Sequence, residues 1–233
     1  MKGQARSQAD RSRMTTRTKV LLVDDHPIVR QGLARLIAQE PDLEVCGEAA
    51  DEGTAWSQVG AHEPGLVLVD LSLKTGNGLE LIKRIRSGYP EMPILVISMH
   101  DEVFYVERAL RAGASGYLTK EEAGDNVLLA IRKILEGEIY LSDRLSPTII
   151  KRLLSGNGGA EESPISRLSD RELEVFQLIG QGLAAQEIAD RLHLSFKTIE
   201  TYQAHIKEKL GLRDIRKLVQ YAVRWAMEHQ EPR

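Results

Sequence analysis

Short apolar runs alternate with helical patterns through the first 140 residues of the chain. Five of these runs have the length and the β-branched content of buried strands. They cover residues 19–23, 43–49, 66–71, 93–97 and 115–119. Between the runs, apolar residues recur at the three- and four-residue spacing of a helix, and a last helical pattern follows the fifth run at about residues 125–136. Strands that alternate with helices are typical of a parallel α/β fold, so the pattern predicts a doubly wound, five-stranded parallel sheet with helices on both faces.

The last third of the chain has only helical patterns, and it predicts a second, smaller all-α domain. A Ser-x-x-Glu capping box at residues 169–172 opens its first helix. A short helix over 185–192, a tight turn and a longer helix from Ser195 to Leu210 follow, and a last helix covers 214–227. A short helix joined to a longer one by a tight turn indicates a helix-turn-helix.

The length of 233 residues fits two domains, and polar stretches mark their boundaries. We predict a disordered basic tail over residues 1–18, the α/β domain over 19–140, a linker over 141–164 and the helix-turn-helix domain over 165–230. Within the linker, residues 147–154 are consistent with a short helix. No apolar run approaches the roughly 20 residues of a membrane helix, and the N-terminus lacks a hydrophobic signal segment. We therefore expect a cytoplasmic protein with no membrane contact.

Charge is spread unevenly along the chain. Residues 1–19 carry six Lys or Arg against one acidic residue, and residues 165–233 carry eleven against ten. Because the whole chain has a formal net charge of −3, the part between these segments is strongly acidic, at −9. An acidic α/β domain suits a cation site. In the last domain six basic residues against three acidic ones lie within 197–217, which favours DNA, although the modest total leaves a four-helix protein-binding bundle as the alternative.

Polar side chains follow the predicted parallel strands where each strand ends. Asp24 and Asp25 follow the first strand, Asp70 the third, Ser98 the fourth and Lys120 the fifth. Because the carboxyl ends of parallel strands meet at one edge of a sheet, we expect these side chains to converge on one site. Two nearby histidines have no metal-ligand spacing to another His or Cys, so we expect them to be solvated. They are His26 and His100.

Six residues near successive strand ends occur in a specific order: Asp24, Asp25, Asp70, Ser98, Tyr117 and Lys120. In this order they resemble the flavodoxin-like receiver domain of bacterial two-component response regulators. The resemblance implies that Asp70 is the nucleophile that accepts a phosphoryl group from a sensor histidine kinase. Lys120 and Ser98 would then contact phosphoryl oxygens, and Tyr117 would rotate into the space that Ser98 leaves. The implied Mg²⁺ ligands are Asp24, Asp25, Asp70 and the carbonyl of Ser72.

Three residues near this set depart from the wider receiver family. Lys74 stands where a proline is usual, four residues after Asp70, and Glu121 stands where a proline often follows the lysine. Met99 follows Ser98 and is bulky enough to shield a phosphoryl group from water. None of these changes removes a required group, so we expect a site that can be phosphorylated and whose phosphoryl group is moderately long-lived.

The run from Leu168 to Leu212 closely resembles the LuxR-type helix-turn-helix of NarL/FixJ-type regulators. The matching pieces are Arg171-Glu172, Glu187-Ile188-Ala189, Leu194-Ser195, Lys197-Thr198-Ile199 and Lys209-Leu210-Gly211. The resemblance implies that one exposed helix face reads the major groove and that further residues contact phosphates. The groove face comprises Lys197, Glu200, Thr201, Ala204 and His205, and the phosphate contacts are Lys197, Thr198 and Lys209. A basic residue is frequent in the family at the position of Glu200, which affects the bases that are read.

These resemblances together predict a two-component response regulator rather than an enzyme. Phosphorylation at Asp70 would control dimerisation and sequence-specific binding to double-stranded DNA, and thereby transcription. The expected partners are a sensor histidine kinase, DNA, RNA polymerase and a second copy of the chain when phosphorylated or DNA-bound. One alternative is an α/β phosphohydrolase with Asp70 as its covalent nucleophile, although no lid insertion or second general acid follows Asp70. Another is an adaptor whose activity needs no phosphate.

Overall fold

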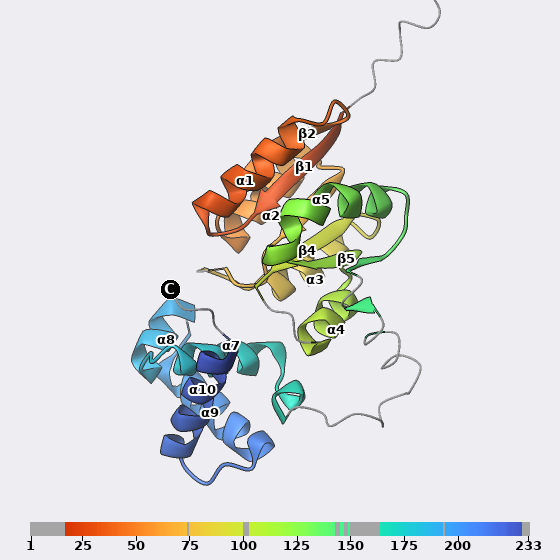
Figure 1. Cartoon of the computed structure of the whole chain (residues 1–233). Coiled ribbons are helices and arrows are strands. Elements are labelled where there is room, and N and C mark those ends of the chain that lie inside the picture. The colour runs from red at the N-terminus through yellow and green to blue at the C-terminus, as the bar shows by residue number, and fades with distance from the viewer. Residues whose placement is uncertain are drawn as a thin grey trace, which may run out of the picture. The chain divides into compact units, whose positions relative to one another are not determined.

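The structure is a computed structural model, and contacts divide the chain into two compact units (Figure 1). The described residues are 17–73, 75–99, 103–142, 145, 146, 149, 164–192 and 194–229. The first unit is built on residues up to 99 together with 109–141. The second takes in the described residues of 100–108 and those from 142 onward.

The first unit contains a six-stranded sheet in which every neighbouring pair is parallel. The strands are β1 (Thr18–Val23), β2 (Leu43–Ala49), β3 (Leu66–Val69), β4 (Ile94–Ser98), β5 (Gly116–Thr119) and β6 (Tyr140–Leu141). Their order in the sheet is β2-β1-β3-β4-β5-β6, so the doubly wound parallel sheet predicted from sequence is confirmed. The prediction of five strands missed β6, because a two-residue strand gives no periodic signal.

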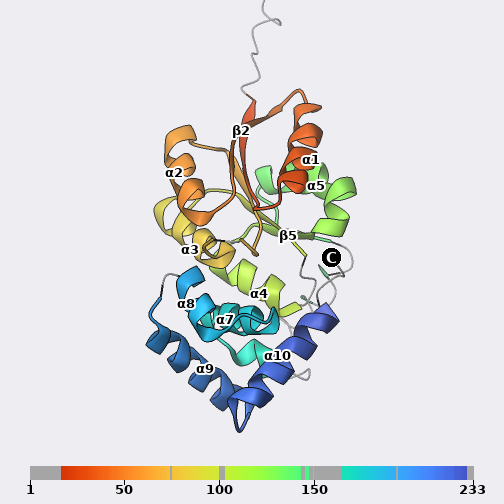
Figure 2. The same cartoon turned by 90° about the vertical axis from the view of Figure 1, so that its left-hand side faces the viewer.

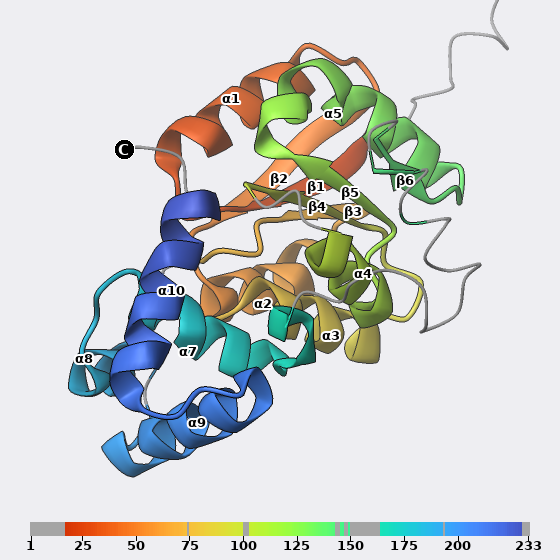
Figure 3. The ribbon, with the colours of Figure 1, turned by 60° about the horizontal axis from the view of Figure 1, so that its bottom comes forward.

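Helices cover both faces of this sheet. They are α1 (Pro27–Ala38), α2 (Glu52–His62), α3 (Gly78–Gly88) and α5 (Lys120–Leu135), whereas α4 (Val103–Ala112) is divided between the two units. Figures 2 and 3 show α1 and α5 on one face of the sheet and α2 and α3 on the other. On the α1 and α5 face the core is mainly aliphatic and includes Val20, Leu68 and Ile131, each at most 2% exposed.

Two helix starts determine where polar groups meet the edge of the sheet. The predicted helix near 125–136 begins earlier, at Lys120, because Thr119 and Glu122 form a capping box. The start of α3 packs so closely on the end of β3 that a Cβ at Gly78 would overlap the carbonyl oxygen of Asp70. The absence of a side chain at this position therefore lets α3 begin beside the end of β3.

The second unit contains the predicted helices of the all-α domain. They are the α-helices α7 (Asp170–Gly180), α8 (Ala185–Leu192), α9 (Phe196–Leu210) and α10 (Ile215–His229), and a 3₁₀ turn that was not predicted, η2 (Pro164–Arg167), precedes them. Phe176 and Trp225 pack edge to face, with ring centroids 5.6 Å apart, in the core between α7 and α10. The helix α9 ends where Gly211 adopts a left-handed conformation, with φ of 66°. The pair α8 and α9 is the helix-turn-helix predicted from the sequence.

Several predicted features lie outside the described residues. They are the tail up to residue 16, most of the short helix at 147–154, Lys74 and His100. In the part of the chain that the structure describes, no helix combines the length and the apolar character that crossing a membrane requires.

Candidate functional site

Three carboxylates meet at the carboxyl ends of neighbouring strands in the first unit. Asp24 and Asp25 directly follow β1, and Asp70 directly follows β3. The Asp70 amide donates to the carbonyl of Val23 at 2.8 Å, which continues the ladder between the two strands and brings their ends together. Asp24, Asp25 and Asp70 are 3%, 7% and 2% exposed. Buried carboxylates require counter-charges or hydrogen bonds, so their neighbours decide what this site does.

Lys120 supplies a positive charge to these carboxylates. Its ammonium nitrogen lies 2.7 Å from Asp70 Oδ2 and 2.8 Å from Asp24 Oδ2. Burial by itself lowers the pKa of this ammonium, but the charge and hydrogen bonds of Asp70 and Asp24 outweigh that effect, so the pKa is raised. Lys120 therefore stays protonated and holds together two carboxylates that come from different strands.

The pKa of the Asp70 carboxyl is strongly perturbed. Burial raises its pKa from the ordinary value of 3.8 to about 6, with Lys120 acting in the opposite direction and Asp24 adding to the rise. The backbone amide of Ser72 donates to Asp70 Oδ1 at 3.1 Å. One oxygen of Asp70 therefore accepts from a backbone amide, and the other is paired with Lys120.

The composition of the site fits a divalent cation. Asp24, Asp25, His26 and Asp70 each offer a ligand atom, and these atoms lie within 4.8 Å of one another. With all three carboxylates ionised, Lys120 balances only one of them, which leaves two negative charges for a cation to neutralise. Carboxylate oxygens are the ligands that Mg²⁺ prefers. The acidic cluster could therefore bind Mg²⁺.

Two further predicted residues lie near the same edge of the sheet. Ser98 ends β4, and Tyr117 lies on the adjacent strand β5, where the register pairs Ser98 with Thr119 and Val96 with Tyr117. Both Ser98 and Tyr117 are fully buried. Tyr117 therefore lies two residues before Thr119, the partner of Ser98 on the neighbouring strand, so a change at Ser98 can reach Tyr117 through the packing of these paired strands.

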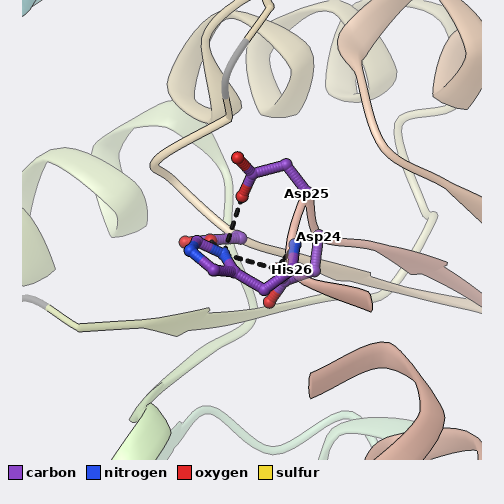
Figure 4. Close-up of side chains that lie close together, drawn as sticks. Asp24, Asp25 and His26 are labelled. Atoms are coloured by element: carbon purple, nitrogen blue, oxygen red, sulfur yellow. Dashed lines mark hydrogen bonds and ion pairs between the residues drawn. The ribbon is translucent and has the colours of Figure 1, made fainter. Parts of the chain in front are cut away.

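The sequence interpretation placed His26 in solvent, and this was only half right. Its side chain is 54% exposed, yet its Nδ1 lies 2.7 Å from Asp25 Oδ1 and 3.1 Å from Asp24 Oδ1 (Figure 4). The backbone amide of His26 also donates to Asp24 Oδ1, at 2.7 Å, at the point where α1 begins. The signal in the sequence was the position of His26, between two buried acids and the proline that opens α1.

In the second unit, α9 presents the residues predicted to contact DNA. Lys197, Glu200, Thr201, Ala204 and His205 are all exposed, whereas the buried side of the helix is formed by other residues. Those buried residues are Ile199 and Ile206. The side chain of Thr198 is half-buried, and its backbone amide donates to the Ser195 hydroxyl at 3.1 Å, which caps the helix.

Lys209 has a partner that the sequence interpretation missed. Its ammonium lies 2.6 Å from Oε2 of Glu172, a carboxylate that also accepts from the backbone amide of Ser169 at 2.7 Å. Burial raises the pKa of Glu172, but the hydrogen bonds from Lys209 and Ser169 outweigh it and leave the pKa lowered. His205 Nδ1 lies 3.8 Å from the other oxygen of Glu172. Glu172 thus ties α9 to the start of α7, which no local pattern could have shown.

Comparison with known proteins matches both units to families. Residues 20–132 match the response regulator receiver domain, and residues 166–222 match the LuxR family of bacterial regulatory proteins. The oxygen regulatory protein NreC of Staphylococcus haemolyticus is 35% identical over 210 residues, which are 88% of this chain and 97% of that protein. NreC of Staphylococcus aureus is 36% identical with the same coverage.

The chain belongs to the NarL/FixJ-type response regulators.

Solved structures of response regulators resemble this one. A LuxR-family response regulator from Aurantimonas sp. SI85-9A1 is 36% identical, with a TM-score of 0.57, over 60% of this chain and 99% of that one. RcsB from Salmonella enterica serovar Typhimurium, solved bound to a promoter in the presence of phosphomimetic BeF₃⁻, is 28% identical, with a TM-score of 0.65, over 89% of this chain and 98% of that one.

Family membership argues against two alternatives that the sequence left open, the phosphohydrolase and the protein-binding bundle. NarL/FixJ-type response regulators are DNA-binding transcription factors rather than enzymes, which argues against the phosphohydrolase. Their two domains imply a histidine kinase and DNA as partners of this response regulator. The α7–α10 helices are accordingly a LuxR-type DNA-binding domain rather than a protein-binding bundle.

Proposed function

We propose that Asp70 accepts a phosphoryl group from a sensor histidine kinase and that this modification controls dimerisation and sequence-specific DNA binding, and thereby transcription. Mg²⁺ would be held by Asp24, Asp25, Asp70 and the carbonyl of Ser72. The receiver domain would cover residues 19–140 and the DNA-binding domain 165–230, joined by the linker between them. The protein would act in the cytoplasm, with RNA polymerase as a further partner.

One observation carries this proposal: Lys120 bridges Asp70 and Asp24 at 2.7 and 2.8 Å in a buried site. Phosphoryl transfer to a carboxylate depends on position and charge neutralisation, because the carboxylate is a weak nucleophile. Lys120 lies where it can meet the new phosphoryl oxygens, and a bound Mg²⁺ would neutralise the remaining charge. Asp51, which lies outside the site, instead accepts from the backbone amide of Thr54 at the start of α2.

The switch would use the two buried residues at the ends of β4 and β5. A phosphoryl group carries about −1.5 to −2 charges, which replace the single negative charge of the Asp70 carboxylate at one strand end. The hydroxyl of Ser98 would move toward it, and Tyr117 would rotate into the space that Ser98 leaves. Because both residues are fully buried, such a movement requires the packing around them to change.

The DNA-binding part of the proposal uses both long helices of the second domain. Lys197, Thr198, Glu200, Thr201, Ala204, His205 and Lys209 would form the contact surface of α9. On α10, Leu218, Ala222 and Trp225 are buried in the domain core, whereas three apolar residues on the same helix are exposed. We propose that these residues pair two DNA-binding domains on half-sites about 10 bp apart. They are Ile215, Val219 and Met227.

Selection of DNA from genomic fragments, with and without acetyl phosphate plus Mg²⁺, tests the proposal. Wild type, Asp70→Ala and a matched control, Glu91→Gln, are compared, because Glu91 is an exposed acid away from the site. A sequence enriched only with phosphodonor, in wild type and Glu91→Gln but not in Asp70→Ala, is the expected result. Equal enrichment in all samples would overturn the switch and favour phosphate-independent activity. No enrichment in any sample would overturn sequence-specific DNA binding.

A further inference from the structure

The junction between η2 and α7 accepts hydrogen bonds from an arginine of α4, whose first half, up to Arg108, belongs to the second unit. Arg108 Nη1 donates to Asp170 Oδ1 at 2.6 Å, and Nη2 donates to the carbonyl of Ser166 at 3.1 Å and to that of Leu168. We propose that these three acceptors form an arginine docking site, that Arg108 occupies it, and that phosphorylation of Asp70 releases Arg108. The release rests on the proposed phosphorylation, whereas the docking does not.

The acceptors of this docking site suit a guanidinium group. Two are backbone carbonyls near the end of η2, and helix ends leave carbonyls that need donors from elsewhere. The third is the carboxylate of Asp170 in the first turn of α7. A guanidinium carries its N–H donors in a rigid planar fork, so a single Arg108 side chain meets all three acceptors. The side chains of Arg108 and Asp170 are only 13% and 20% exposed, so loss of either partner leaves a largely buried charge unpaired.

A second contact shows that two helix faces meet here. Tyr105 lies three positions before Arg108, on the same face of α4, and its hydroxyl accepts from Gln177 Nε2 at 2.5 Å. Gln177 lies seven positions after Asp170, which places both residues on one face of α7. The ring of Phe104 lies beside the Arg108 guanidinium, with 5.9 Å between its centroid and Cζ. Because Phe104 and Tyr105 are buried, the first half of α4 docks through a packed face rather than through one side chain.

The position of α4 in the chain connects this docking site to the receiver site. The helix follows β4, whose last residue is the buried Ser98, and its second half, from Ala109 to Ala112, belongs to the first unit. In the proposed switch Ser98 moves, and a packed strand end cannot move without changing where the next helix begins. The guanidinium needs three acceptors in fixed directions, so a small displacement of α4 weakens all three hydrogen bonds together. Phosphorylation and docking then oppose each other through one element.

Hydrogen–deuterium exchange of the full-length protein over residues 165–173 measures the docking. Within this segment the amides of Leu168 and Leu173 are hydrogen-bonded to backbone carbonyls. We expect Arg108→Gln to speed exchange of the segment by at least about 10-fold, because the three acceptors lose their charged donor. Arg111→Gln makes the same chemical change at an exposed position of the same helix and should leave the exchange unchanged. Exchange over α9 should stay slow in both variants.

Wild type treated with acetyl phosphate and Mg²⁺ gives a readout that needs no variant at the docking site. We expect phosphorylated wild type, identified by its intact mass, to exchange over residues 165–173 as fast as Arg108→Gln, and Asp70→Ala to stay slow. Unchanged exchange in Arg108→Gln, or equal acceleration over α9, would overturn the docking. Slow exchange in phosphorylated wild type would overturn the release alone. Wild type that gains no phosphoryl mass would instead overturn the proposed phosphorylation and the release with it, so the failures are distinguishable.

Discussion

Replacing Asp70 by Asn should stabilise the metal-free receiver domain at neutral pH. Burial raises the pKa of Asp70 from 3.8 to about 6. The ionised carboxylate therefore destabilises the folded protein relative to the protonated carboxyl. A carboxyl of this kind contributes stability that is complete below pH 3.8 and is lost as the pH rises through about 6. A difference of about 2 pKa units corresponds to about 3 kcal/mol, because each unit is worth about 1.4 kcal/mol.

Asn is close in shape to the neutral carboxylic acid, so Asp70→Asn should recover most of this free energy. We expect its free energy of unfolding at pH 7.5 to exceed that of wild type by about 2–3 kcal/mol, and the difference to shrink as the pH falls toward 4. Urea unfolding in EDTA measures it. The chain has two tryptophans, so a Trp225→Phe background leaves Trp56, which packs under the Arg84 guanidinium in the receiver unit, as the reporter.

Two comparisons make this prediction refutable. Asp125→Asn makes the same chemical change at an exposed position of α5 and should alter stability by less than about 0.5 kcal/mol. Addition of Mg²⁺ should reverse the order, because the ion stabilises the wild-type site by mass action and binds the Asn variant less well. The reasoning is wrong if Asp70→Asn is equally or less stable than wild type in EDTA at pH 7.5.

Three further substitutions test the packing of the two domains. Gly78→Ala should lower the free energy of unfolding by about 1–3 kcal/mol and weaken Mg²⁺ binding, because the added Cβ would overlap the backbone of Asp70. Urea unfolding measures the first effect and calorimetry the second. Gly124→Ala, in α5 with open space around its Cβ, should instead stabilise by about 0.5–1 kcal/mol. Glu172→Gln keeps the capping box but loses the ion pair with Lys209, so it should lower the free energy of unfolding by about 1 kcal/mol at pH 7. Urea unfolding monitored by Trp225 fluorescence measures this loss. Because the pKa of Glu172 is lowered, this cost should fade as the pH drops below about 4.5, and a constant difference would contradict the assignment.

The receiver site could be predicted where topology converts sequence order into position. In a doubly wound parallel sheet the residue that ends each strand lies at one edge, so Asp24, Asp70 and Lys120 had to converge once their strands were identified. The orientation of His26 could not be predicted in this way. Its ring direction depends on one rotamer and on a backbone hydrogen bond to Asp24, and neither has a periodic signal.

Contacts between residues that are far apart in the chain also could not be predicted from the sequence pattern. Glu172 fitted its capping-box role with Ser169 alone, and its second role with Lys209 joins residues 37 positions apart. The start of α5 at Lys120 was missed because its first turn is polar, and the capping box of Thr119 and Glu122 outweighs the missing apolar periodicity. Local hydrogen-bond chemistry determines both features, whereas the hydrophobic pattern identified the surrounding elements.

The charge balance of the site explains why the proposed phosphorylation should need the metal and why it should change the structure of neighbouring strands. Without an ion, three buried carboxylates against Lys120 leave two negative charges, and a phosphoryl group would add more to a site that water screens poorly. A divalent cation brings the unphosphorylated site close to neutrality. The proposed phosphorylation would then restore about one unbalanced negative charge, which would attract the Lys120 ammonium and the Ser98 hydroxyl. Since Ser98 and Tyr117 are fully buried on paired strands, a movement of the Ser98 hydroxyl toward that charge would require a rearrangement of β4 and β5.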